Sequence, residues 1–468
     1  MSDRGFLTYR EPDSSSTSAP IPRLTTKVVQ LLVLISFFVL LNVGEWLASK
    51  AFRAGLIGQI VVGLVYGRPL ANILDIAWQH TFIALGYLGL VLIIVEGSLA
   101  VRLDLLKANF VLSVFAACIG ILAPIGLSFL ALYLGFGYGA VETFICGAAL
   151  SSTSIGTTFV VLGQASSAVA FADTKVGSVL ISAAVFDDVA GLAMASVIEQ
   201  LSDDAGRLGW LIGRPILASV LMAALTPLLT KFAFAPLFRH LEPPRGHWAN
   251  MSLMVGVLCA FLAIAAYAGT SLLFGAFLAG TFLAYLENEP GRFMKTYAKY
   301  VLDVQQYLMQ PIFFASIGFA IPFKSLWSGR AVWRGVVYAL LMVIGKVLVG
   351  TVIPLWDVLR HKGTLRERTS GTLWPSVLLG GAMVARGEIG LLIIQIGFNK
   401  TAYLSQDALI TAIWAILLNT VIGPVAVGFL VKYKAQEIGT SQWGIQKHGS
   451  GEQSEVSVNA SNVEAGNG

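Results

Sequence analysis

Apolar runs of about 20 residues recur along this chain, and each is long enough to cross a hydrocarbon core of about 30 Å as a helix. Hydrophobic residues make up 56% of the 468 residues, and charged residues make up only 12%. The runs are continuously apolar, whereas the strands of a membrane barrel alternate between apolar and polar residues. The sequence therefore predicts an all-α protein that crosses a lipid bilayer many times.

We count thirteen candidate transmembrane spans: 28–47, 54–70, 80–99, 109–135, 140–163, 175–198, 210–236, 249–268, 270–286, 302–321, 333–355, 375–398 and 406–432. A polar N-terminal segment, 1–27, precedes them. The chain after Tyr433 is rich in Ser, Gly, Asn, Gln and Glu, a composition that cannot bury a core. We therefore expect one transmembrane domain over 28–433 and a disordered polar tail over 434–468.

The loops between alternate pairs of spans differ in their number of lysines and arginines. The richer set includes Arg102, Lys107, Lys175, Arg239, Arg245, Lys295, Lys299 and Arg360. The positive-inside rule places this set in the cytoplasm, and with it the C-terminus. The net charge of +5 suits this orientation better than binding to nucleic acid. The same rule places the N-terminus on the outer side, and Arg4, Arg10 and Lys27 near it argue weakly against this placement.

Thirteen spans can divide into six, a linker and six. The offset of seven spans gives the two halves opposite orientations, which is the geometry of an inverted repeat. The fifth and twelfth spans then correspond, and polar residues interrupt both of them. Interrupted spans in corresponding positions indicate where the binding site of a transporter lies.

Two adjacent aspartates, Asp187 and Asp188, lie in the middle of the span 175–198. Neighbouring residues on a helix point about 100° apart, so one carboxylate can face a cavity and the other a neighbouring helix. A carboxylate in hydrocarbon needs a cation, a proton or water, and such residues are functional by default. The alternative is a structural pair of hydrogen-bonded carboxyls.

Lys346 is a second charge in the middle of a span, in "LLMVIGKVLVGTVIP". An opposing carboxylate within about 4–6 Å would keep a buried lysine charged. Asp187 or Asp188 is the evident partner. The alternative is that Lys346 extends along the helix to reach the membrane interface.

The run "GAALSSTSIGTTFVVLG" (147–163) includes Thr153 and Ser154 among six hydroxyl residues. Glycines and hydroxyls at this density permit an unwound segment whose carbonyls coordinate a cation. They equally permit close helix packing without unwinding. In "GGAMVARGEIGLLIIQIG" (380–397), Arg386 and Glu388 can neutralise each other or the ends of a broken helix. We favour a structural role for both over ion ligation.

Several motifs in order resemble the monovalent cation/proton antiporter superfamily, the sodium/hydrogen exchanger family that includes the NapA and NhaA types. They are "GLIGQIVVGLVYG", "SSTSIGTTFVVLG", "AAVFDDVAGL", "GTSLLFGAFLAGT", "QPIFFASIGF", the lysine of "IGKVLVG" and "MVARGEIGL". Two positions depart from the family pattern. "VEGSLAV" replaces the usual "FLAGLE", and Ile155 replaces the usual proline, which blurs the assignment to a branch.

The resemblance implies a thirteen-helix fold with a core domain, a dimerisation domain and crossed broken helices at the fifth and twelfth spans. It implies that Asp188 binds proton and cation in turn, and that Asp187 pairs with Lys346, as in the Asp-Asp branch that often moves net charge. Thr153 and Ser154 would lie near the site. Arg386 and Glu388 would support the core, and the protein would be a homodimer without a cofactor.

We therefore expect a transporter in the plasma membrane or an organelle membrane that exchanges Na⁺ or K⁺ for protons. A cation channel or a non-transporting sensor with the same fold is the alternative. An intramembrane aspartyl protease fits poorly, because its two aspartates must share a water from different helices. An enzyme is therefore not expected.

Overall fold

The computed structural model describes residues 21–101, 109–154, 174–201, 208–241, 246–286, 291–360 and 371–444. Regular structure within these ranges is entirely helical. Among the described residues, eight helices are long and apolar enough to cross a membrane, and four shorter apolar helices accompany them. The predicted all-α membrane fold is confirmed at this level.

The first half of the chain forms the helices α1 (Ile21–Phe52), α2 (Gly55–Tyr66), α3 (Ile76–Leu99), α5 (Phe110–Ser128), α6 (Ala140–Ser151), α8 (Lys175–Gln200), α9 (Leu208–Leu229) and α10 (Ala235–Leu241). The second half forms α11 (His247–Ala268), α12 (Leu272–Leu286), α13 (Arg292–Tyr300), α14 (Leu302–Val304), α15 (Gln310–Ala320), α16 (Phe323–Leu326), α17 (Gly329–Val347), α18 (Val352–Arg360), α20 (Leu373–Ala382), α21 (Glu388–Lys400) and α22 (Gln406–Thr440). Every predicted span contains one or more of these helices.

The sequence explains where several helices begin. Oγ1 of Thr174 accepts the Gly177 amide at the start of α8, and Oγ of Ser405 accepts the Ala408 amide at the start of α22. These side chains satisfy amides that have no partner inside their own helix. The interiors are apolar, and many of their large side chains remain exposed, among them Leu122 and Leu217. Exposed apolar side chains on membrane-length helices suit contact with lipid.

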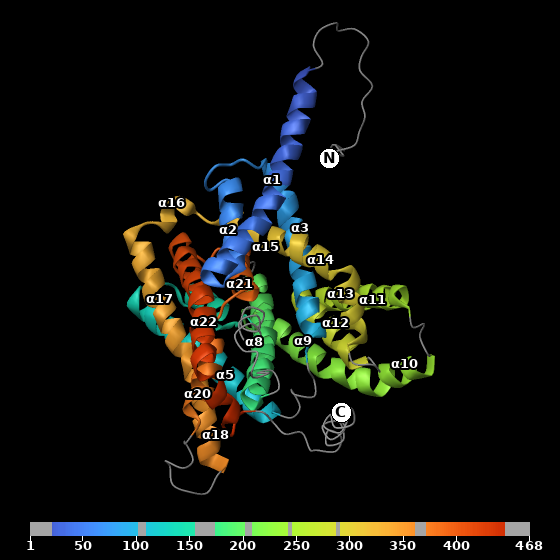
Figure 1. The fold of residues 1–468 in the computed structure, drawn as a ribbon, viewed down its shortest axis with the longest axis vertical. Coiled ribbons are helices and arrows are strands. Elements are labelled where there is room, and N and C mark those ends of the chain that lie inside the picture. The colour runs from blue at the N-terminus through green and yellow to red at the C-terminus, as the bar shows by residue number, and fades with distance from the viewer. Residues whose placement is uncertain are drawn as a thin grey trace, which may run out of the picture.

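The helices pack in two groups (Figure 1). In one group α2 contacts α1 and α15, and α3 contacts α12 and α15. In the other group α5, α6, α8, α17, α20, α21 and α22 contact one another. Helix α8 joins the groups, because it also contacts α9 and α12. Backbones meet closely where α2 crosses α15: a Cβ built on Gly63 would lie 2.1 Å from the carbonyl oxygen of Ala315.

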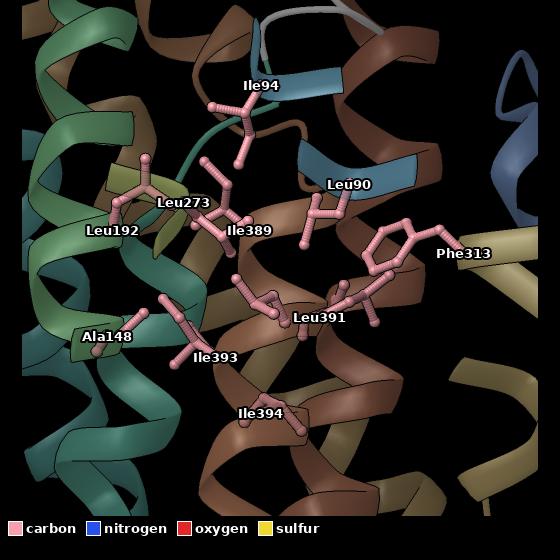
Figure 2. Close-up of a cluster of buried hydrophobic side chains, with 14 of the residues drawn as sticks. Leu90, Ile94, Ala148, Leu192, Leu273, Phe313, Ile389, Leu391, Ile393 and Ile394 are labelled. Atoms are coloured by element: carbon pink, nitrogen blue, oxygen red, sulfur yellow. The ribbon is translucent and has the colours of Figure 1, made fainter. Parts of the chain in front are cut away.

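Two of the short helices are short because their spans are interrupted. Helix α6 ends at Ser151, and 152–154 continue as non-helical backbone. Helix α20 ends at Ala382, and α21 begins only at Glu388. Helix α21 lies in the main hydrophobic core, where its Ile389 and Ile393 pack among Leu90 of α3, Leu192 of α8 and other side chains (Figure 2). The buried second half of this span places the break next to α8.

The last helix is longer than expected. It continues past Tyr433 to Thr440, and Trp443 beyond it is fully buried. Residues 434–444 therefore belong to the folded part of the chain, although the sequence placed the start of a disordered tail at 434. Polar composition was misleading here because Ile438 and Trp443 pack into a hydrophobic cluster. Residues 1–20, 155–173 and 445–468, which include Thr157 and Thr158 of the hydroxyl-rich run, lie outside the described ranges.

Candidate functional site: a buried ion pair at two helix breaks

Lys346 of α17 reaches Asp187 of α8. The distance between Lys346 Nζ and Asp187 Oδ2 is 2.5 Å, and neither side chain has any exposed surface. Each of two opposite charges at this depth stabilises the other, because a lone buried charge carries a large desolvation penalty. Lys346 therefore faces the interior of the helix group and does not extend to the membrane interface.

Thr153 forms hydrogen bonds with both members of this pair. Its Oγ1 donates to Asp187 Oδ2 over 2.8 Å and accepts from Lys346 Nζ over 2.9 Å. The hydroxyl also lies 3.4 Å from the carbonyl oxygen of Met383. Thr153 follows the end of α6, and Met383 follows the end of α20. One hydroxyl therefore touches both helix breaks and both members of the ion pair.

The two breaks are also joined through the backbone. The Ser154 amide donates to the carbonyl oxygen of Ala385 over 2.9 Å and so links the two non-helical segments. Arg386, which is fully buried, donates from its guanidinium to the carbonyl oxygen of Ser152 over 2.5 Å. A cation at the carbonyl end of α6 offsets the negative end of that helix dipole.

Glu388 lies at the opposite kind of helix end, an N-terminus. It is the first residue of α21, and its carboxylate accepts a hydrogen bond from the Ser154 side chain. A carboxylate at a helix N-terminus offsets the positive end of the dipole. Within the described ranges no ion pair joins Arg386 to Glu388. Of the two arrangements that the sequence left open, the structure therefore has these charges at the ends of broken helices.

Asp188 differs from Asp187 in its surroundings. It is partly exposed, whereas Asp187 is buried. Oδ1 of each aspartate is shielded and has no hydrogen-bond partner in the described part of the chain, but only Asp187 has its other oxygen bonded to Lys346 and Thr153. The Asp188 neighbours Phe186, Val189 and Ala190 line a cavity of about 330 Å³ between α5, α8, α9 and α12, although Asp188 is not one of the lining residues.

Gly120 of α5 is a site residue that sequence reasoning missed. A Cβ at this position would lie 3.3 Å from both Asp187 Oδ1 and Lys346 Nζ. The missing side chain thus leaves room for the ion pair against α5. A glycine in an apolar span was the available signal, but many spans of this chain contain one.

A buried ion pair at the crossing of two interrupted helices, in an all-helical membrane protein, defines the class of ion-coupled transporters. The family model for the sodium/hydrogen exchanger, transmembrane, matches residues 32–433. The chain therefore belongs to the sodium/hydrogen exchanger family. Proteins of this family exchange cations for protons and are transporters, which excludes an enzyme and disfavours the channel that the sequence left as an alternative.

Individual relatives match this sequence over most of its length. A Na⁺/H⁺ antiporter of Enterococcus hirae is 23% identical over 412 residues, which cover 86% of this chain and 97% of that protein. The Na⁺/H⁺-K⁺ antiporter GerN of Bacillus cereus is 24% identical over 380 residues, which cover 81% and 90%. The solved sodium proton antiporter MjNhaP1 of Methanocaldococcus jannaschii has the same fold, with a TM-score of 0.58, 16% identity and coverage of 87% and 97%.

Proposed function

We propose that the chain exchanges Na⁺ or K⁺ for protons by alternating access, and that Asp188 is the carboxylate that binds either the cation or the proton. The observation that carries this proposal is the contrast between the two aspartates. Lys346 and Thr153 already neutralise and bond Asp187 through its Oδ2, whereas Asp188 forms neither an ion pair nor a hydrogen bond with the described residues.

Competition for one carboxylate couples the two fluxes. A carboxylate at membrane depth is stable when it holds a cation or a proton, and costly when it holds neither. It therefore changes sides with one or the other. Thr153 and Ser154 would contribute oxygen atoms near the bound cation, and Arg386 and Glu388 would keep the broken helices in place around it.

Lys346 has a second role in this proposal. A cation that reaches Asp188 brings positive charge to the residue beside Asp187, which weakens the attraction between Asp187 and Lys346. Lys346 can then lose its proton, and this proton contributes to the charge moved in each cycle. The Asp187–Lys346 pair thus couples the binding of the cation to the release of a proton.

Several finer features of the fold belong to the same proposal. Thirteen crossings in two inverted six-helix repeats agree with the interruptions after α6 and between α20 and α21, which fall in corresponding spans. The helix group that contains α8 and α17 would be the moving core. The group that contains α1 and α2 would form the homodimer interface, with the C-terminus in the cytoplasm and no cofactor bound.

Proteoliposomes that contain the full-length protein test the proposal. At zero membrane potential, an imposed Na⁺ or K⁺ gradient should move protons against their own electrochemical gradient, which a pH-sensitive dye reports, whereas neither a channel nor a sensor can do this. Asp188→Asn should abolish the signal. Asp407→Asn is the matched control, because the Asp407 side chain is 69% exposed at the start of α22. Cation-driven proton flux that persists in Asp188→Asn would remove Asp188 from its role.

A further inference from the structure

The end of the described chain caps the helix that carries the two aspartates. The Lys175 amide donates to the carbonyl oxygen of Gly444 over 3.0 Å, and the Val176 amide donates to that of Trp443 over 3.1 Å. Amides in the first turn of a helix have no partner within the helix. Thr174 supplies an acceptor for Gly177, and the segment Ser441–Gly444 supplies acceptors for the two amides before it.

The Trp443 side chain reaches a second helix. It is fully buried, and its Nε1 donates to Oδ2 of Asp357 on α18 over 2.8 Å. The Lys175 ammonium lies 4.0 Å from the centroid of the indole ring, a cation–π contact. Trp443 therefore holds the first turn of α8 and the side of α18 together.

Apolar packing surrounds this connection. Trp443 belongs to one buried cluster with Val176 and Val179 of α8, Ile353 of α18 and Ile438 of α22. The clustered side chains come from three helices that are far apart in the sequence. Burying an indole with its N–H bonded adds apolar area without an unsatisfied donor.

Trp443 joins α8 to α18, and the ion pair joins α8 to α17, which continues into α18 through the 3₁₀ turn Leu348–Thr351. Asp187 lies about twelve residues after Lys175 on α8, or roughly 18 Å along the helix. Lys346 lies about eleven residues before Asp357, or roughly 16 Å if the helical path from α17 to α18 is straight. The Asp187–Lys346 contact and the Lys175–Trp443–Asp357 contact thus connect the same two helical segments at two similarly spaced points.

We propose that Ser441–Gly444 is a positioning element of the ion site, which fixes the register of α8 against α17 and α18 and so fixes Asp187 against Lys346. Two points of attachment prevent α8 from sliding or rotating about the ion pair alone. The segment does not touch the transported ion, and its residues act through α8. This inference rests on the exchange function proposed above.

Two substitutions and two truncations test the inference in proteoliposomes. Trp443→Ala removes the ring, and Trp443→Phe keeps a ring but loses the donor to Asp357. A stop after Thr440 removes the whole segment, whereas a stop after Gly444 keeps it. Trp248→Ala is the matched control, because Trp248 is 77% exposed at the start of α11.

The readout is the apparent KM for the driving cation, measured beside the maximal rate at equal amounts of folded protein. Trp443→Ala and the stop after Thr440 should raise this KM at least about fivefold, the lower end of coupling between distinct sites. Trp443→Phe should give a smaller rise, and the stop after Gly444 and Trp248→Ala should match the wild type. A segment that only stabilised the fold would lower the amount of active protein and leave KM unchanged.

Unchanged KM values in Trp443→Ala and Trp443→Phe would overturn the inference, provided that the wild type exchanges cations for protons in the same vesicles. Absence of exchange by the wild type would instead overturn the proposed function. If Trp443→Ala does not fold, Trp443→Phe decides together with Asp357→Leu, which removes the oxygen that accepts from Trp443 Nε1. The two substitutions remove the same contact, so their effects on KM should not add when they are combined.

Discussion

Lys346 Nζ lies 2.5 Å from Asp187 Oδ2 in surroundings that leave neither side chain any exposed surface. The contact joins α17 to α8, and Thr153 ties both charges to the break after α6. One charge pair thus holds three separate segments of the chain at the place where their helices end or cross. Stability and transport should therefore depend on the same three residues.

Removing one member of this pair should destabilise the protein more than removing both. Lys346→Met leaves Asp187 buried without a cation, which costs about 3–5 kcal/mol. The double variant Asp187→Asn with Lys346→Met leaves neither member of the pair charged, so we expect part of the loss to be recovered. Thermal unfolding in detergent, followed by tryptophan fluorescence, measures both effects.

The Lys400–Glu199 pair provides the control for this comparison. Its charged atoms are 3.9 Å apart, and the side chains are 61% and 45% exposed. Exposed pairs contribute at most about 1 kcal/mol, so Lys400→Met should unfold at nearly the wild-type temperature. Equal unfolding temperatures for Lys346→Met and Lys400→Met would contradict the prediction.

The Thr153 hydroxyl should matter more than the methyl group beside it. Thr153→Val keeps the shape of the side chain but removes a donor to Asp187 and an acceptor for Lys346, and buried groups left unsatisfied cost about 1–3 kcal/mol each. We expect lower stability and a changed apparent KM for the cation. Thr153→Ser restores the hydroxyl and should recover most of both properties. A serine variant as impaired as the valine variant would argue that packing, not hydrogen bonding, sets the role of Thr153.

Bulk at Gly120 should disturb the ion pair directly. A Cβ at this position would lie 3.3 Å from both charged groups, so Gly120→Ala requires a small shift and Gly120→Val a larger one. Overpacking of this kind costs about 1–3 kcal/mol. Exchange rates should fall in the order wild type, alanine, valine. Gly126→Ala on the same helix is the control, because a Cβ at Gly126 would meet no described atom within 4 Å.

Glu388 should be replaceable where Asp188 is not. Glu388→Gln keeps a carbonyl oxygen that can accept from Ser154, and it loses a charge at a helix N-terminus that is worth about 0.3–1 kcal/mol. We expect exchange to fall by less than about tenfold, the factor that corresponds to about 1.4 kcal/mol. Loss of all exchange in Glu388→Gln, as expected for Asp188→Asn, would place Glu388 among the ion-binding residues.

The sequence was sufficient for the membrane fold and the family, because long apolar runs and an ordered set of motifs are properties of the chain itself. A partner for Lys346 could also be expected, since a buried lysine needs a carboxylate. The bond from Arg386 to the Ser152 carbonyl could not be foreseen, because it depends on how two distant breaks cross. The fold of the chain after Tyr433 was missed for a similar reason: Trp443 is one apolar residue in a polar stretch, and its contacts come from α8 and α18.

The dependence of exchange on pH provides the last test. If proton and cation compete for Asp188, a lower pH raises the fraction of protonated carboxyl and so raises the apparent KM for the cation. Where the carboxyl is mostly protonated, mass action gives an increase of about tenfold for each unit that the pH falls. The maximal rate should change less, because excess cation displaces the proton. Initial rates over a range of cation concentrations at several pH values measure both quantities, with Asp407→Asn as a variant that should follow the wild-type profile. A KM that stays constant as the pH falls, with only the maximal rate decreasing, would show that proton and cation bind at different groups.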